Sequence, residues 1–180
     1  MEREIKLRFE GPDAARTAIL ELGAVPLRAR RLQSDTVFDT PARELSCRAE
    51  VLRVRVEDGH HSVTFKSPIP DETMKLREEI ETTVGSGPVV MTILGRLGFV
   101  VSFRYEKYRE EFTLGEVVVA LDETPVGTFV EIEGSEAGIH AVATALGRGP
   151  HEFVLESYRA LFVQTCEAIG TTPTDMIFAR

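Results

Sequence analysis

Charged and apolar side chains alternate at a period of two along several stretches of the chain, and this spacing predicts β-strands with one polar and one apolar face. The first ten residues show the pattern most clearly, because four charged side chains would share one face while Ile5, Leu7 and Phe9 would face a core. Further strands are expected over residues 25–40, 51–56, 62–66, 75–83, 99–112, 117–122 and 129–133.

Apolar residues at the spacing of amphipathic helices separate some of these strands. Helices are expected over residues 12–22, 88–97, 135–146 and 157–169. Gly23 and Gly98 would end the first two of them. A turn is expected over residues 42–45 and a loop over residues 68–71. The second helix has an apolar stripe that is expected to be buried, formed by Val89, Val90, Ile93, Leu94 and Leu97.

The length and the apolar content of the chain suit one folded core. The chain has 180 residues, of which 43% are hydrophobic, and no low-complexity segment or linker divides it. We therefore expect a single domain over residues 1–170, followed by a short C-terminal tail over residues 171–180.

The charge balance narrows the range of partners. Asp and Glu number 29 against 21 Lys and Arg, and the net charge of -8 argues against a general nucleic-acid or anionic-membrane surface. Cys47 and Cys166 lack the spacing of a disulfide framework or a thiolate metal site, and no apolar stretch has the length of a signal peptide or a membrane span. We expect a soluble, cytoplasmic protein, and the sequence leaves a homodimer open.

Nearly every predicted strand carries charged side chains at positions i and i+2, and therefore on one face. Two arrangements fit this pattern. The charged faces could be the solvated side of a flat sheet with helices behind it. Alternatively, antiparallel strands could close into a barrel whose lumen holds the charges and whose apolar outer face is covered by helices.

Charges inside a barrel would need partners, because burying an unpaired charge is costly. A polyphosphate with divalent cations would supply them. Arg and Lys pair with phosphoryl oxygens, and paired carboxylates hold Mg²⁺ or Mn²⁺ through hard oxygen ligands. The closed arrangement therefore predicts a site for a metal-bound polyphosphate.

Several motifs resemble, in their order along the chain, those of the CYTH domain family, the triphosphate tunnel metalloenzymes. Residues 2–6 (Glu-Arg-Glu-Ile-Lys) resemble the E-x-E-x-K signature that opens the domain. Residues 34–41 and 52–55 resemble its D-x-Y-x-D-T-P and L-R-x-R run, and residues 77–81 resemble its R-x-E-x-E. The later strands and the closing helix at residues 157–159 continue the resemblance to about residue 162.

The resemblance implies an α+β fold, in which a closed eight-stranded antiparallel β-barrel is surrounded by helices. It also implies a small-molecule substrate that is a linear triphosphate or ends in one, and Mg²⁺ or Mn²⁺ as cofactor. The substrate-binding bases would be Lys6, Arg8, Arg53, Arg55, Lys66, Arg77, Lys107 and Arg109. Catalytic roles would fall to Lys6, Arg53 and Lys107. The candidate metal ligands are Glu2, Glu4, Glu79, Glu81, Asp122, Glu131 and Glu133.

Some positions leave alternatives open. Arg77, Glu79 and Glu81 could form internal ion pairs that position the phosphate-binding bases, instead of contacting a metal or substrate. Val37 stands where the family usually has an aromatic residue, and Ser67 replaces a glycine. These departures concern turns and not the charged set.

Three functions are compatible with this charged lumen. The first is hydrolysis of a phosphoanhydride bond in tripolyphosphate, a nucleoside triphosphate or thiamine triphosphate. The second is the class IV adenylate cyclase reaction, in which the ribose 3′-hydroxyl of ATP attacks the α-phosphate and releases pyrophosphate, although no residue set in the sequence identifies an adenine pocket. The third is a module that binds polyphosphate or nucleotide without turnover, against which the two acidic pairs argue.

Overall fold

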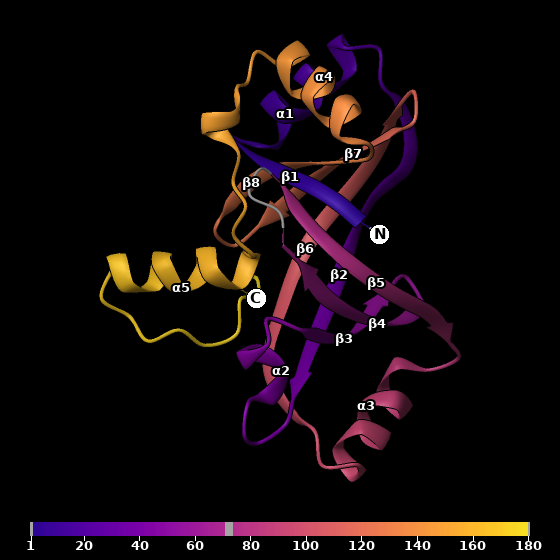
Figure 1. Cartoon of the computed structure of the whole chain (residues 1–180), viewed down its shortest axis with the longest axis vertical. Coiled ribbons are helices and arrows are strands. Elements are labelled where there is room, and N and C mark those ends of the chain that lie inside the picture. Colours follow the sequence, from indigo (N-terminus) through magenta and orange to yellow (C-terminus); the bar gives the residue numbers. More distant parts are fainter. Residues whose placement is uncertain (1, 71–73, 180) are drawn as a thin grey trace.

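Eight antiparallel strands close into a barrel in the computed structural model, which describes residues 2–70 and 74–179 (Figure 1). The strands are β1 (Glu2–Phe9), β2 (Val25–Asp39), β3 (Val51–Glu57), β4 (His60–Ile69), β5 (Lys75–Val84), β6 (Val100–Leu114), β7 (Val117–Thr124) and β8 (Gly127–Glu133). Around the barrel they are hydrogen-bonded in the order β1-β5-β4-β3-β2-β6-β7-β8. The structure confirms the expected closed eight-stranded barrel.

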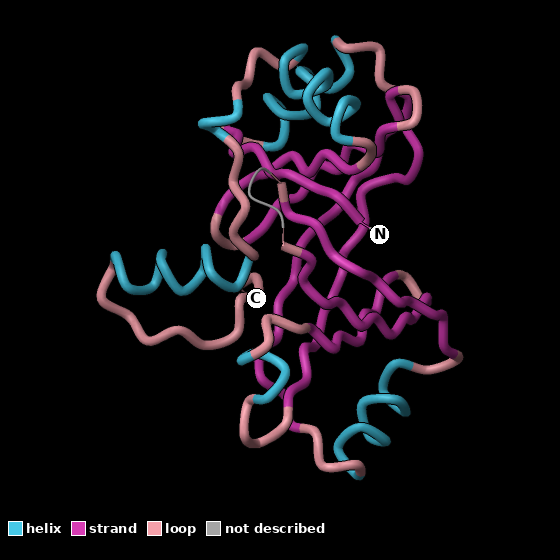
Figure 2. Tube along the Cα trace, in the orientation of Figure 1, coloured by secondary structure: helices cyan, strands magenta, loops and turns pink. Residues whose placement is uncertain are grey.

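Helices pack on the outside of this barrel (Figure 2). They are α1 (Pro12–Glu21), α2 (Glu44–Cys47), α3 (Gly87–Arg96), α4 (Glu136–Ala145) and α5 (Tyr158–Ala168). Figure 1 shows α1 and α4 together at one end of the molecule, α3 at the other end, and α5 projecting from one side. Of the helices in the described residues, none is both long enough and apolar enough to cross a membrane.

The main core lies between α1, α4 and the outer face of β1, β7 and β8. Ile5 and Leu7 of β1 are each 1% exposed, and they pack in one cluster with Ile19 of α1 and Ile139 of α4. Because side chains alternate across a strand, burial of Ile5 and Leu7 on the outside turns Glu4 and Lys6 to the inside of the barrel. The hydrophobic face thus determines where the charges go.

A second core cluster joins α5 and the C-terminal segment to the barrel. Tyr158 and Leu161 of α5 pack with Phe103, Phe129 and Met176. The backbone of Met176 exchanges hydrogen bonds with β6, accepting from the Glu106 amide at 2.9 Å and donating to the Arg104 carbonyl at 2.9 Å. The segment around Met176 therefore packs along β6, whereas the division into a domain and a tail stays a prediction.

The prediction of a buried stripe on the second helix is wrong for three of its five residues. Val89 and Ile93 of α3, and Leu97 just after its end, are 57%, 51% and 70% exposed, whereas Val90 and Leu94 are half-buried. The helix approaches the barrel at its N-terminal end, where a side chain on Gly87 would meet the Val56 side chain at 3.1 Å. Amphipathic spacing shows that a helix has an apolar face, but it does not show that another element covers that face.

Two local predictions also need correction. Pro68 and Ile69 continue β4 instead of forming a loop, and Asp71 lies outside the described residues. Beyond Lys66, β4 pairs with β5 but no longer with β3 in the described ladder, and a proline is tolerated at such an edge. The expected turn after Thr40 leads into the short helix α2, which Asp39 caps by accepting hydrogen bonds from the amides of its first turn.

Candidate active site in the barrel lumen

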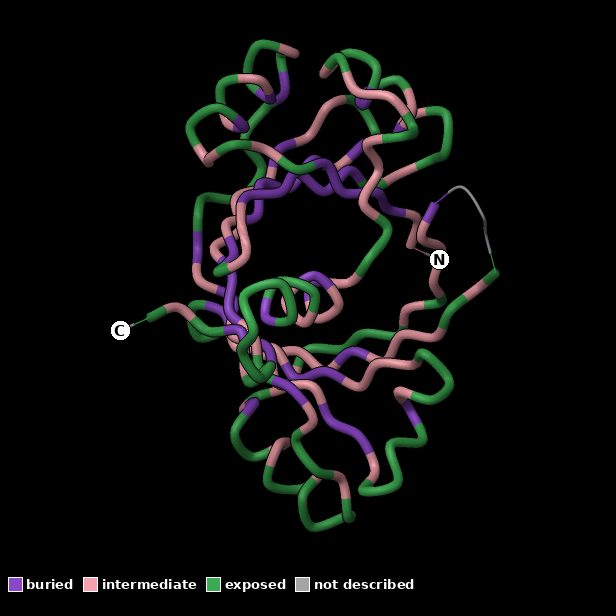
Figure 3. The backbone as a smooth tube through the Cα atoms, turned by 90° about the vertical axis from the view of Figure 1, so that its left-hand side faces the viewer, coloured by how far each residue is buried: buried purple, intermediate pink, exposed green. Residues whose placement is uncertain are grey.

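The charged faces of the strands surround a cavity of about 790 Å³ inside the barrel. Figure 3 shows the ring of strands from the side on which α5 projects. Of the two arrangements that the sequence allowed, the closed one forms, and charged side chains from β1, β3, β4, β5, β6 and β8 line the lumen. The cavity therefore brings together residues that lie far apart in the sequence.

Seven of the eight predicted substrate-binding bases line this cavity. They are Lys6, Arg53, Arg55, Lys66, Arg77, Lys107 and Arg109. Arg8 lies elsewhere: its guanidinium donates to the Val126 carbonyl at 3.2 Å and stands 4.7 Å from the centre of the Phe129 ring. A phosphate-binding role for Arg8 stays a prediction, and it has no part in the function proposed below.

Arg53 is a buried lumen base whose donors are only partly used in hydrogen bonds. The residue is 8% exposed, and its guanidinium donates to the Thr64 hydroxyl at 3.0 Å and to the Tyr105 hydroxyl at 3.5 Å. The nearest carboxylate oxygens, of Glu81 and Asp35, lie 3.6 and 3.7 Å away. Its Nε is buried and finds no hydrogen-bond partner among the described residues. A buried donor without a partner indicates a place where an external acceptor would bind.

Asp35 holds the neighbouring base in place, and the sequence reasoning missed it. Asp35 is 2% exposed and accepts two hydrogen bonds from Arg55, at 2.8 and 2.9 Å. Burial raises the pKa of Asp35, but the charges of Arg55 and Arg53 outweigh burial and keep the pKa well below its usual range. The sequence did contain a signal for it: Asp35 is two residues from Val37 and four from Asp39, so the three side chains share one face of a strand.

Lys107 and Arg109 form a second basic pair, which Asp122 holds from behind. The Lys107 ammonium lies 2.8 Å from Asp122, and the Arg109 Nε lies 2.6 Å from the other oxygen of the same carboxylate. Asp122 is 0% exposed and also accepts a hydrogen bond from the Tyr158 hydroxyl at 2.7 Å. Asp122 thus has two basic partners and one hydroxyl partner. Its role as a metal ligand stays a prediction.

The pKa of Lys107 is lowered within the lumen. Burial, as the largest cause, and the nearby charge of Arg109 lower the pKa of Lys107 to about 8, and the attraction of Asp122 and Glu131 only partly opposes them. An anion bound beside Lys107 would favour its charged form and so raise this pKa.

Carboxylates from β1 and β8 gather beside these bases. Across the β1–β8 ladder, Glu4 lies opposite Glu133 and Lys6 lies opposite Glu131. Burial and the charges of Glu2 and Glu4 raise the pKa of Glu133 to about 7. A cation bound beside Glu133 would favour the charged form of this carboxylate.

Several of the predicted metal ligands already have basic partners. Glu2 accepts a hydrogen bond from Lys66 at 2.5 Å, and the same ammonium lies 2.9 Å from Glu79. Glu4 is paired with Lys75, a lumen lysine that the sequence reasoning missed although it alternates with Arg77. The ion pairs considered for the R-x-E-x-E strand are therefore present in part.

The chemistry of the acidic group fits a hard divalent cation, since Glu2, Glu4, Glu131 and Glu133 face one cavity from adjacent strands. Within residues 2–70 and 74–179, no three His, Cys, Asp or Glu side chains are close enough to form a complete site for a metal ion. Mg²⁺ is commonly held by one or two carboxylates together with substrate phosphates. This donor set suits a cation of that kind.

Comparison with known proteins gives a consistent result. A family model described as the CYTH domain matches residues 1–148. A protein of Methanocaldococcus jannaschii that bears adenylate cyclase as a provisional name is 30% identical over 141 residues, which cover 78% of this chain and 80% of that protein.

Solved structures share the fold. The PH1012 protein of Pyrococcus horikoshii OT3 is 27% identical, with a TM-score of 0.76 over 89% of this chain and 99% of that one. A Hippeastrum protein, provisionally named an adenylyl cyclase and described as having a dominant triphosphatase activity, is 20% identical, with a TM-score of 0.66 over 96% of this chain and 98% of that one. At this identity the second likeness shows the fold alone.

Proposed function

The chain belongs to the CYTH domain family, and from this premise we propose that it is a divalent-metal-dependent enzyme that hydrolyses a phosphoanhydride bond of a triphosphate inside the barrel. The substrate would be tripolyphosphate or a nucleoside or thiamine triphosphate. The buried Nε of Arg53 among the lumen bases is the observation that carries the proposal, because it makes no hydrogen bond within the described residues and its nearest carboxylate oxygen, of Asp35, lies 3.7 Å away.

The lumen bases would bind and orient the phosphate chain. Arg53 has a free donor, and Lys6, Lys66 and Lys107 retain donors beyond those used in their ion pairs, because an ammonium has three. Ion pairs with Asp35 and Asp122 hold Arg55 and Arg109 in place before substrate arrives. Bases that are already oriented need little rearrangement to stabilise the charge that develops during phosphoryl transfer.

In hydrolysis, the oxygen of a water molecule forms a bond to the terminal phosphorus while the bond from that phosphorus to the bridging oxygen breaks. Diphosphate, or an organic diphosphate, leaves with the electron pair, and the lumen bases stabilise its negative charge. Enclosure of the reaction by the barrel limits access of bulk water and strengthens these electrostatic interactions.

Members of this family depend on a metal, and we infer that Mg²⁺ or Mn²⁺ fills that role here. The residues proposed to hold it are Glu2, Glu4, Glu131 and Glu133. When bound, the metal would neutralise phosphate charge and act as a Lewis acid. Without it, these carboxylates would repel a triphosphate.

Formation of a cyclic nucleotide is the second candidate, and it is favoured by the provisional name of the Methanocaldococcus jannaschii relative. In that reaction the ribose 3′-oxygen attacks the α-phosphorus of ATP and pyrophosphate leaves. The same basic lumen could serve both reactions, which differ in the attacking oxygen and in the bond that breaks.

Product analysis separates the candidates. The protein should be incubated with tripolyphosphate, ATP or thiamine triphosphate, with Mg²⁺, with Mn²⁺ and with a chelator, and the products should be separated by anion exchange. Orthophosphate with the matching diphosphate supports hydrolysis, and cyclic AMP with pyrophosphate supports cyclisation. Tight binding of tripolyphosphate with no product under any metal condition would show a binding module and refute the enzyme proposal.

A further inference from the structure

The lysines of this chain all lie inside the barrel. The sequence contains four of them, Lys6, Lys66, Lys75 and Lys107, and each lines the cavity. Every other strongly basic residue of the chain is an arginine. An ammonium is a compact charge on a flexible stem, whereas a guanidinium is a planar group that binds a carboxylate through two parallel hydrogen bonds. The two kinds of base can therefore serve different purposes in the lumen.

Two of the lumen arginines are held in fixed ion pairs. Arg55 donates to both oxygens of Asp35 at 2.8 and 2.9 Å, and Arg109 donates to both oxygens of Asp122 at 2.6 and 2.5 Å. Both aspartates are almost completely buried. Paired hydrogen bonds fix the orientation of each guanidinium, so the position of these charges is set by the protein itself.

Lys75 is held in a different way. Across the β1–β5 ladder it lies opposite Glu4, and its ammonium donates to one oxygen of the Glu4 carboxylate. The Lys6 ammonium lies 3.3 Å from that same oxygen. The Lys75 side chain is 19% exposed, against 1% for Lys6. If the Lys75 ammonium moved away, Glu4 would therefore keep a second ammonium beside it.

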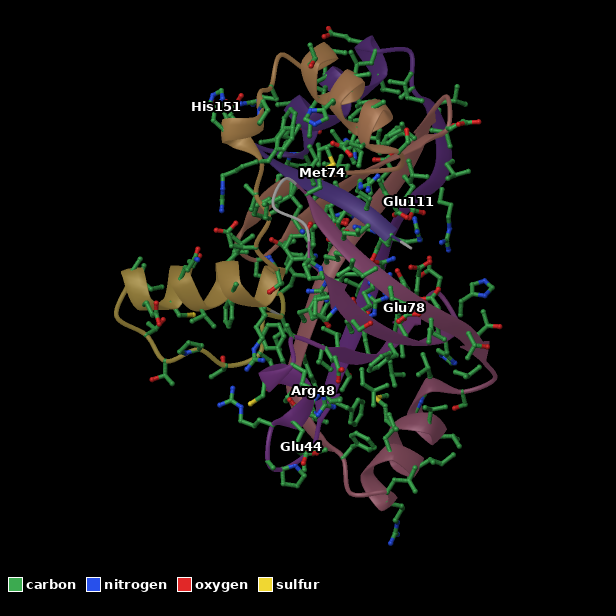
Figure 4. The ribbon with its side chains drawn as sticks, viewed as in Figure 1. Glu44, Arg48, Met74, Glu78, Glu111 and His151 are labelled. Atoms are coloured by element: carbon green, nitrogen blue, oxygen red, sulfur yellow. The ribbon has the colours of Figure 1, made fainter. Side chains whose placement is uncertain are left out.

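Such a movement would involve the side chain and not the strand. Met74, which directly precedes Lys75, is 1% exposed and packs in the main core cluster with Ile5 (Figure 4). The backbone at the start of β5 is thereby anchored to the core. The ammonium, in contrast, is carried on a flexible stem and can reach another acceptor within the cavity.

The partner of Lys75 is one of the carboxylates proposed above to hold the metal. On β1, Glu4 stands between Lys75 of β5 and Glu133 of β8. A divalent cation bound by Glu4 would use a carboxylate that already has an ammonium as its partner. Because the two positive charges repel each other at short distance, the metal and the ammonium would compete for Glu4.

We propose that Lys75 is an internal counter-cation of the metal site: its ammonium neutralises Glu4 in the metal-free protein, and a divalent cation displaces it. This inference rests on the proposed function, because it takes Glu4 as a metal ligand. The lysine limits the cost of burying an acidic group before the metal arrives. The displaced ammonium stays in the lumen, where it would donate to a phosphate oxygen of the substrate.

Manganese binding to the protein alone tests the inference without any turnover. Lys75→Met removes the ammonium and keeps the length of the side chain, whereas Lys75→Arg keeps a positive charge. Lys107→Met is the matched control, because it removes another lumen ammonium, one that lies 2.8 Å from Asp122. Wild type and the three variants should be titrated with Mn²⁺ without any phosphate compound, and free Mn²⁺ should be measured by electron paramagnetic resonance.

We expect Lys75→Met to bind Mn²⁺ about tenfold more tightly than wild type, which is within the usual range for two coupled binding events. Lys75→Arg and Lys107→Met should each change the affinity by less than about fivefold, the lower end of that range. A lysine that only stabilised the fold would lower the free energy of unfolding on replacement without raising the affinity for Mn²⁺.

Amine labelling of wild type gives a second measurement that does not depend on the folding of a variant. Because the lysines all line the cavity, reductive methylation with formaldehyde and a borohydride reagent reports on the lumen amines, which peptide mass spectrometry distinguishes. Compared with a chelator, Mn²⁺ should raise the labelling of Lys75, because its ammonium loses Glu4 as a partner. The labelling of Lys107 should stay unchanged.

The inference would be overturned by a Mn²⁺ affinity that rises equally in Lys75→Met, Lys75→Arg and Lys107→Met, or that does not rise in Lys75→Met. Labelling of Lys75 that Mn²⁺ leaves unchanged or lowers would overturn it as well. The absence of Mn²⁺ binding to wild type and to every variant would instead refute the metal dependence of the proposed function. The two failures are therefore distinguishable.

Discussion

Replacing Arg53 with alanine should weaken tripolyphosphate binding by about 1.5 to 3 kcal/mol, the range for a hydrogen bond that involves a charged group. In terms of Kd this is roughly a ten- to 150-fold loss. The reason lies in the buried Nε of Arg53, which makes no hydrogen bond within the described residues and would donate to a phosphate oxygen.

The substitution should leave the protein folded. It removes hydrogen bonds from Arg53 to Thr64 and Tyr105, at about 0.5 to 1.5 kcal/mol each, and it also removes repulsion with Arg55. Asp35 keeps its two hydrogen bonds from Arg55, so no buried carboxylate is left unpaired. We expect the free energy of unfolding to fall by no more than about 2 kcal/mol.

The measurement is calorimetric titration of tripolyphosphate, combined with urea denaturation of each protein. Arg104→Ala is a suitable control, because Arg104 belongs to the same barrel but is 54% exposed as a side chain and pairs with Asp175 outside the lumen. The control should bind as wild type does. A folded Arg53→Ala protein whose affinity stays within twofold of wild type would refute a phosphate role for this base.

Three further substitutions examine the charge network. Glu133→Gln should raise the metal concentration needed for half-maximal turnover by about tenfold or more. Because the pKa of Glu133 is raised to about 7, the free energy of unfolding of wild type should fall as the pH rises from 4.5 to 7, and that of the variant should not. Equal metal dependence would contradict the first expectation, and parallel melting-temperature profiles the second. Tyr158→Phe should lower the free energy of unfolding by about 1 to 2 kcal/mol in urea, because it removes the hydrogen bond to Asp122, and unchanged stability would exclude that contribution. Asp35→Asn should lower the free energy of unfolding by about 3 to 5 kcal/mol at pH 7, because it leaves Arg55 buried without its carboxylate. Since the pKa of Asp35 is lowered in the folded protein, this difference from wild type should shrink as the pH falls below about 4. A constant difference over that pH range would show that the charge of Asp35 is not responsible.

Much of the fold could be predicted from local pattern. The alternation in the first strand correctly assigned Ile5 and Leu7 to the core and Glu4 and Lys6 to the opposite face, because the side-chain period of a strand is two wherever the strand lies. The serine N-caps of the last two helices were predictable for a similar reason, since a cap depends on the few residues around it.

Part of the candidate site was also predictable. Seven of the eight predicted bases line the lumen, because charged side chains two residues apart in a strand share one face. The sequence could not show that Arg8 leaves this set, that Asp122 lies behind the wall, or that Lys75 lies among the lumen side chains. These placements depend on the position of each residue relative to the curved wall and to neighbouring strands.

By itself, then, the sequence determined which side chains share a face, where most helices begin and end, and that bases and acids would occupy one side of a sheet. Only the tertiary structure decided that the sheet closes, that Asp35 meets Arg55, and that Val89 and Ile93 of α3 stay exposed. The physical reason is that periodicity is set within one strand or helix, whereas strand pairing and packing join segments that lie far apart in the chain.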